Sequence, residues 1–244
     1  PQVFVSASAI GFYGNQRDEF LDERSLKGHG FLSDVCQHWE DEILKAKDLG
    51  IRTAVCRIGM VLGHDGGALD KILPPFKLGA GGKLGSGSQW MSWIHINDLS
   101  DMMIYAIENP SIDGVYNAVS PNPVLNREFT KVLGKVLKRP TLFPVPNFVL
   151  KVVLGELSDL LLGSQKVNAQ KIIDAGFEFK HPKLEEALRE VCEHSYHEIK
   201  LEKWVPQPLN KTFSFFKEAK NLEKITPKFL KFKVLKQSTP EIQE

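Results

Sequence analysis

The sequence is poor in cysteine and has no long apolar run. Its three cysteines, Cys36, Cys56 and Cys192, lie far apart and form no CxxC pair. This pattern argues against a disulfide framework or a thiolate zinc site and favours reduced thiols. No stretch reaches the roughly 18 apolar residues that a membrane span needs, and the most apolar one, residues 148–162, is interrupted by charged side chains. These absences predict a cytoplasmic protein without a transmembrane segment.

The chain also lacks an excess of charge of either sign. It has 31 Lys and Arg against 30 Asp and Glu, a formal net charge of +1. Such a balance offers no electrostatic basis for binding nucleic acid or a membrane surface. The GxSxG motif of serine hydrolases is absent as well. With 42% hydrophobic residues in 244, we expect a globular protein with a sizeable core that binds a small-molecule substrate.

The first residues, 1–14 (PQVFVSASAIGFYG), organise the predicted fold. An apolar, β-prone run leads into small residues and glycines, which predicts a buried strand ending in a tight turn. Apolar residues then recur at helical spacing over 31–49, Gly50 ends that run, and 51–56 form a β-branched strand. Strand, helix, strand predicts a parallel, right-handed βαβ unit in an α/β fold. Because a strand begins at residue 1, we expect the chain to be a fragment.

The rest of the chain alternates short helical and extended patterns. The acidic loop 15–30 has no metal-ligand spacing, and we predict no metal site there. The glycine-rich run 79–88 matches neither GxGxxG nor GxxxxGK[ST] and is more typical of a mobile loop near an active site. The predicted helices are 69–78 (interrupted at Pro74-Pro75), 99–108, 127–137, 147–154, 164–175 and 184–192, and the predicted short strands 89–96, 114–118 and 141–145.

Candidate binding residues gather where the predicted strands end. In an open α/β sheet the carboxyl ends of the strands form the ligand site, so we expect segments 6–14, 57–63 and 93–98 to meet there. Ser6 and Ser8 offer hydroxyl groups beside accessible backbone. They fit equally well as small residues that a tight strand end requires.

Three further side chains could carry chemistry, and each has a structural alternative. Arg57 could bind a phosphate or carboxylate bidentately, or pair with a carboxylate of the neighbouring helix. Tyr13 and His95 are candidate proton-transfer groups, although His95 in an aromatic strand is more simply a hydrogen-bonded structural histidine. Asp98 is most simply a helix cap.

Several long motifs carry a family resemblance. The order SASAIGFYG, FLSDVCQHWEDE, RIGMVLGHDGGAL, LGAGGKLGSGSQWMSWIHINDL and GVYNAVSPNPV resembles extended short-chain dehydrogenases/reductases, in particular NAD-dependent epimerases of the sugar-nucleotide epimerase-like subfamily. The later motifs LLGSQKV and AGFEFKHPKLEEAL resemble the C-terminal domain of unknown function (DUF1731) of those proteins. The tail motif WVPQPLNKTFSFFKEAKNLEKITPKFLKF is similar to the opening of a START-like (SRPBCC) ligand-binding domain.

The resemblance implies three parts. Residues 1–143 would be the C-terminal half of a Rossmann-type doubly wound parallel sheet with its substrate region, and 144–193 a small, mostly helical domain. Residues 194–244 would be a truncated α+β START-like segment, which binds an apolar ligand when complete. The full-length protein would bind NAD or NADP, while the first βα turn with its GxxGxxG fingerprint would lie outside this chain.

The implied activity is that of an NAD(P)-dependent oxidoreductase or epimerase acting on a carbonyl or hydroxyl group, such as that of a nucleotide sugar. The family's Tyr-x-x-x-Lys pair should open the helix at 31–49, where Phe31 or Leu32 and Val35 or Cys36 stand instead. Because this pair is missing, a non-catalytic NADP(H)-binding sensor or scaffold is the alternative.

Site residues follow from the resemblance by position. Ser8 best matches the family's substrate-orienting serine, with Ser6 as the alternative because the turn length differs, and Tyr13 or His95 would replace the missing tyrosine. The predicted catalytic residues are Ser8 and Tyr13; the predicted cofactor-binding residues are Ser6, Ala7, Ser8, Phe31, Arg57, Ile58, Gly59 and Val61; and the predicted substrate-binding residues are Trp93 and His95.

Overall fold

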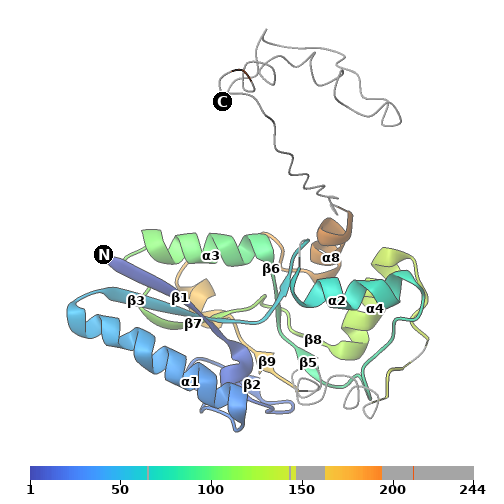
Figure 1. Ribbon diagram of the computed structural model, residues 1–244, viewed down its shortest axis with the longest axis horizontal. Helices are drawn as coiled ribbons and strands as arrows, with labels where there is room; N and C mark the ends of the chain where they lie inside the picture. The colour runs from blue at the N-terminus through green and yellow to red at the C-terminus, as the bar shows by residue number, and fades with distance from the viewer. Residues whose placement is uncertain (65, 143, 147–162, 194–210, 212–244) are drawn as a thin grey trace. The chain divides into compact units, whose positions relative to one another are not determined.

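The computed structural model describes residues 1–64, 66–142, 144–146, 163–193 and 211 (Figure 1). The chain divides into two compact units, Pro1–Tyr196 and His197–Glu244, and the fold described below is that of the first. The predicted helix 147–154 and, apart from residue 211, the predicted START-like segment 194–244 lie outside the described residues.

A parallel sheet forms the centre of the first unit. Strands β1 (Val3–Ala9), β3 (Arg52–Ile58) and β7 (Gly114–Ala118) pair in the order β1-β3-β7, all parallel. The predicted α/β class with a parallel sheet is therefore confirmed. The strand predicted to be buried is only half-buried, and Phe4 is 41% exposed. The reason is that β1 lies at the edge of the sheet that the described residues form.

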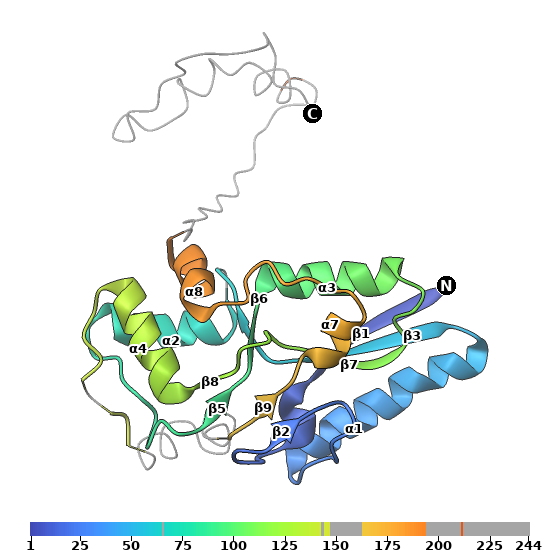
Figure 2. The same ribbon diagram turned by 180° about the vertical axis from the view of Figure 1, so that it is seen from behind.

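Helices cover both sides of this sheet. Helix α1 (Phe31–Leu44) and helix α3 (Ile96–Glu108) both contact β1 and lie on opposite sides of the sheet in Figures 1 and 2. The predicted helix 31–49 ends in a 3-10 turn, η2 (Lys45–Leu49), and Gly50 then adopts a left-handed conformation with φ of 73°. This conformation is accessible to glycine and ends the helical run as expected.

The start of α3 differs from the prediction. His95, not Asp98, occupies the N-cap, and its ring nitrogen Nδ1 accepts a hydrogen bond from the Asn97 N–H. Asp98 lies in the first turn with no solvent exposure and accepts hydrogen bonds from the backbone N–H groups of Lys180 and His181. The carboxylate therefore anchors a distant loop instead of capping its own helix.

Smaller elements surround the end of the sheet. Helix α2 (Gly67–Lys77) continues through Pro74-Pro75, so the predicted interruption is wrong; Leu78 N–H still bonds to the Pro74 carbonyl. The predicted strand 141–145 is represented in the described residues by a single bridge between Leu84 and Val145. The remaining elements are η1 (Ile10–Tyr13), β2 (Phe20–Leu21), β4 (Met60–Leu62), β5 (Trp90–Met91), β6 (Trp93–His95), β8 (Val124–Leu125) and α4 (Asn126–Leu137).

Residues 163–193 complete the hydrophobic core. They form strand β9 (Lys166–Val167), helix α7 (Gln170–Asp174) and helix α8 (Leu184–Glu193), so the predicted helix 164–175 begins too early. Val167 and Ile172 pack in the same buried cluster as residues of β3 and β7, and Leu188 belongs to a second buried cluster. The assignment of 144–193 to a separate domain stays a prediction. None of the described helices is long and apolar enough to cross a bilayer.

Candidate functional site

An apolar pocket of about 390 Å³ lies where β1 and β3 end. The chain from Ala9 to Gly11 and the chain from Ile58 to Met60 line it, together with Phe76 of α2 and Phe129 of α4. Its volume falls within the range of small-molecule pockets, about 300–1,000 Å³. The pocket therefore occupies the predicted place, at the carboxyl ends of parallel strands.

Helix α1 presents two side chains to this pocket. Leu32 and Cys36, one turn apart, line it, whereas Phe31 is 78% exposed and Val35 lies outside the lining. The structure thereby resolves the register that the sequence left open. Burial raises the pKa of the Cys36 thiol, so this side chain is a neutral thiol near pH 7.

Most of the predicted site residues do not line this pocket. Ile58 and Gly59 line it. Ser8 and Arg57 do not, although each comes directly before a lining residue, Ala9 and Ile58 respectively. Successive side chains of a strand point to opposite faces. When one residue faces the pocket, the residue before it therefore faces the core. Outside the lining lie also Ser6, Ala7, Tyr13, Phe31, Val61, Trp93 and His95.

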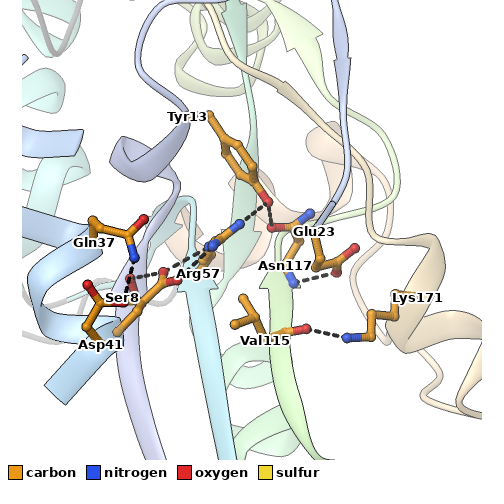
Figure 3. Close-up of polar contacts among 10 residues, drawn as sticks. Ser8, Tyr13, Glu23, Gln37, Asp41, Arg57, Val115, Asn117 and Lys171 are labelled. Carbon is orange, nitrogen blue, oxygen red and sulfur yellow. Dashed lines mark hydrogen bonds and ion pairs between the residues drawn. The ribbon is translucent and has the colours of Figure 1, made fainter. Parts of the chain in front are cut away.

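Ser8, Tyr13 and Arg57 belong instead to a buried polar network (Figure 3). The Ser8 hydroxyl donates to Glu40 Oε1 at 2.7 Å. Arg57 donates to both carboxylate oxygens of Glu40, at 2.8 and 2.7 Å, and to the Tyr13 hydroxyl at 3.0 Å. Tyr13 donates in turn to Asn117 Oδ1 at 2.7 Å. Arg57 therefore pairs with a carboxylate of the neighbouring helix, which is the structural alternative stated for it.

The network holds its groups in fixed protonation states. Burial raises the pKa of Tyr13 to about 12, against the opposing effect of the Arg57 cation. Burial alone would lower the pKa of Arg57, but the hydrogen bonds and charge interactions with Glu40 and Tyr13 together outweigh this and raise it. The guanidinium also stacks 3.4 Å from the centre of the Phe12 ring. Arg57 therefore stays charged and the Tyr13 phenol stays protonated at neutral pH.

The two predicted substrate-binding side chains are buried away from the pocket. Trp93 has no exposure, and its indole N–H donates to the Asn122 carbonyl at 3.0 Å. His95 also has no exposure and stacks on the ring of His181, with ring centres 3.9 Å apart. Both side chains are enclosed by contacts within the protein, as in the structural alternative stated for His95, and their assignment to the substrate site stays a prediction.

The polar groups of the pocket were not among the residues predicted from the sequence. Gln165 lines it and donates through Nε2 to the carbonyls of Ile10 and Gly14, both at 3.0 Å. Asn126 lines it at the start of α4, and its Oδ1 accepts from the Leu84 N–H. No sequence signal places Gln165 at a site more than 150 residues away, because the contact depends on how the 163–193 segment folds back.

A second, polar pocket of about 340 Å³ adjoins the first at Leu84. The indole of Trp90 lines the apolar pocket and donates to Asp18 in the polar one, at 2.9 Å. The glycine-rich run contributes Ser86 and Ser88 to its wall. That run follows helix α2 rather than a strand, so it does not form the strand–turn–helix that binds a pyrophosphate.

Comparisons with known proteins reveal similarity over most of the first unit. The model of a domain of unknown function, DUF1731, matches residues 145–191. The chain is 47% identical over 194 residues to an Arabidopsis thaliana protein described as a chloroplastic homologue of the epimerase family protein SDR39U1, covering 79% of this chain and 55% of that one. It is 40% identical over 192 residues to the epimerase family protein YfhF of Bacillus subtilis, covering 78% and 63%.

Solved structures also show similarity to epimerase family proteins. The human epimerase family protein SDR39U1 with NADPH superimposes with a TM-score of 0.75 at 35% identity, covering 80% of this chain and 66% of that one. A nucleoside-diphosphate sugar epimerase from Corynebacterium glutamicum gives 0.63 at 35% identity, covering 78% and 37%. A Thermus thermophilus UDP-glucose 4-epimerase with NAD, at 16% identity and 0.61, shares the Rossmann-like fold; it covers 78% and 63%. The chain spans 55% to 65% of the length of the curated relatives it matches.

Proposed function

We propose that this chain, an SDR39U1-like epimerase family protein over the residues that align, contributes the reaction pocket of an NAD(P)-dependent oxidoreductase or epimerase. Over those residues it is an extended short-chain dehydrogenase/reductase with a DUF1731 segment. The observation that carries the proposal is the apolar pocket at the ends of β1 and β3. The NADPH bound to the human relative supports this choice of cofactor. The substrate is a small carbonyl or hydroxyl compound.

The pocket suits one end of such a cofactor. Its walls are apolar, with Leu32, Ile72 and Phe129 among them, so a flat nicotinamide ring would be held against hydrocarbon and shielded from water. When bound, the nicotinamide supplies or accepts a hydride. Strand β4 leads through Gly63, Gly66 and Gly67 into α2 at this pocket, but these glycines do not have the GxGxxG spacing of a pyrophosphate-binding turn. The residues of the pocket would therefore hold the ring end and not the pyrophosphate.

The proton path differs from that of the wider family. Leu32 and Cys36 occupy the two α1 positions that face the pocket, and neither is a tyrosine or lysine. Cys36 is the one ionisable side chain among the described residues of the pocket lining. As a neutral thiol it could donate a proton, but not accept one. The hydroxyl of Ser8, predicted to orient the substrate, donates its hydrogen bond to Glu40.

The lack of a tyrosine–lysine pair at the α1 positions that face the pocket also favours a second candidate function. A pocket without an acid–base pair is compatible with a protein that binds NADP(H) without turnover, as a sensor or scaffold. The two functions differ in one measurable property, since only the enzyme oxidises bound NADPH in the presence of a carbonyl substrate.

The test combines binding and turnover. NADPH binding to the purified full-length protein is measured by calorimetry, and NADPH oxidation is followed over a panel of carbonyl compounds. Leu32→Trp fills the pocket and should weaken NADPH binding at least tenfold. Phe31→Trp, on the exposed neighbouring position, is the matched control and should bind as the wild type does. Unchanged binding by Leu32→Trp would remove the pocket as the cofactor site, whereas tight binding without turnover would favour the sensor.

A further inference from the structure

Three histidines and a glutamate gather at the ends of β4 and β6, beside helix α8. His64 follows β4, His95 ends β6, His181 precedes α8, and Glu190 lies on α8. None of the four lines the apolar pocket. Four separate chain segments thus bring nitrogen and carboxylate groups to one place, which the proposed function does not use.

The cluster is compact and partly accessible. His95 is fully buried, while the side chains of His64 and Glu190 are 19% and 29% exposed. The ligand atoms of His95, His181 and Glu190 all lie within 4.8 Å of one another. On the other side of the carboxylate, His64 Nε2 is 3.9 Å from Glu190 Oε1. An ion could therefore reach the group from solvent while His95 closes its inner side.

Hydrogen bonds fix which ring nitrogens carry protons. His64 Nδ1 lies 2.8 Å from the Val191 carbonyl, so Nδ1 is the donor and Nε2 is the ring nitrogen on the side of Glu190. His95 Nδ1 accepts from the Asn97 N–H at 3.2 Å, so the proton of neutral His95 is at Nε2, which faces Glu190 Oε2. His95 therefore donates to the carboxylate, and His64 presents a ligand atom beside it.

We propose that Glu190, His181 and His64 bind a divalent transition-metal ion, with Zn²⁺ the best match, and that His95 orients Glu190 from behind. Two imidazoles and a carboxylate are a ligand set that Zn²⁺ accepts, with water in the fourth position. A ring nitrogen that donates to a backbone carbonyl, as in His64, and a ligating carboxylate that itself receives a hydrogen bond are the outer contacts typical of such sites.

Two of the three separations in the proposed ligand set are close to those of a zinc site. Zinc bonds of about 2.0–2.2 Å place tetrahedral ligand atoms roughly 3.5 Å apart. His64 Nε2 lies 3.9 Å from Glu190 Oε1, and ligand atoms of His181 and Glu190 lie within 4.8 Å of each other. Asp98 already fixes the backbone of His181 by accepting its N–H at 3.0 Å. The ion would tie α8 to the loop after β4, and hence the 163–193 segment to the core.

The experiment is metal binding by the whole chain, independent of any activity. Protein freed of metal with a chelator is titrated with Zn²⁺ by calorimetry, and Co²⁺ serves as a spectroscopic probe. We expect one Zn²⁺ per chain, and a Co²⁺ spectrum with visible bands of a tetrahedral or five-coordinate site but without thiolate charge transfer. His181→Ala and Glu190→Gln should each weaken Zn²⁺ binding at least tenfold. His38→Ala, at an exposed position of α1, should leave it unchanged.

Three results would overturn the proposal. They are no stoichiometric binding by the wild type, wild-type affinity in His181→Ala and Glu190→Gln, or a Co²⁺ spectrum showing cysteine ligation. Circular dichroism of each variant checks folding. Because Glu190→Gln preserves the shape of the side chain and the wild-type titration needs no variant, the proposal stays testable if His181→Ala does not fold.

Discussion

Arg57 on β3 and Glu40 on α1 form a buried, bidentate ion pair, in which the distances from the Arg57 nitrogens to the Glu40 oxygens are 2.8 and 2.7 Å. Their side chains are 5% and 3% exposed. Glu40 also accepts from Ser8, and Arg57 also donates to Tyr13. One charged pair thus links the strand, the helix and the turn whose neighbouring residues form the walls of the apolar pocket.

Removing one member of this pair should destabilise the protein strongly. Glu40→Ala leaves the Arg57 cation buried without its partner, and we expect a loss of about 3–5 kcal/mol in the free energy of unfolding, measured by urea denaturation. The control is Asp41→Ala, the next residue, whose exposed carboxylate bonds to Gln37; it should cost about 0.5 kcal/mol or less. Equal effects of the two substitutions would contradict the structural role of the pair.

The protein should lose stability in alkali. Burial raises the pKa of Cys56 from 9.0 to about 11 and that of Tyr13 from 10.0 to about 12. In each case the unfolded state loses its proton first, so the contribution is complete below the unfolded pKa and is lost as pH rises to the folded value. The free energy of unfolding should therefore fall between pH 9 and 12. In Tyr13→Phe the decline between pH 10 and 12 should be smaller, and an identical profile would count against the buried phenol.

Glycine is required at one wall of the pocket and not at another. A Cβ on Gly59 would lie 2.6 Å from the Ser92 carbonyl oxygen, which is backbone and cannot easily move. A Cβ on Gly11 would make ordinary contacts of 3.6 Å and more. Gly59→Ala should therefore lose about 1–3 kcal/mol and much of its NADPH affinity, whereas Gly11→Ala should fold as stably as the wild type by thermal denaturation.

The 163–193 segment should behave as core. Leu188 of α8 has no exposure and belongs to a buried cluster with Trp93 and Phe129. Leu188→Ala should cost about 2–5 kcal/mol in urea denaturation, in a single transition with the rest of the first unit. Leu49→Ala, at a site 78% exposed, serves as comparison and should be close to neutral. A separate, low-stability transition for α8 would speak for an independent domain.

The sequence by itself determined the parallel α/β class, the helix that opens at Phe31 and the end of the sheet where the pocket lies. These depend on hydrophobic periodicity and on glycine at defined places, which are local properties. Helix 164–175 was placed too early because Lys166 and Val167 pair with β2, a contact distant in sequence.

Only the tertiary structure decided which side chains enter the pocket. Ser8 and Arg57 have the chemistry of site residues, yet Ala9 and Ile58 line the cavity instead. Polarity cannot distinguish a buried network from a ligand site, because both need hydrogen-bonding groups at a strand end. The difference is the carboxylate of Glu40 on helix α1. It pairs with Arg57 on β3, and this pairing makes Arg57 a structural cation.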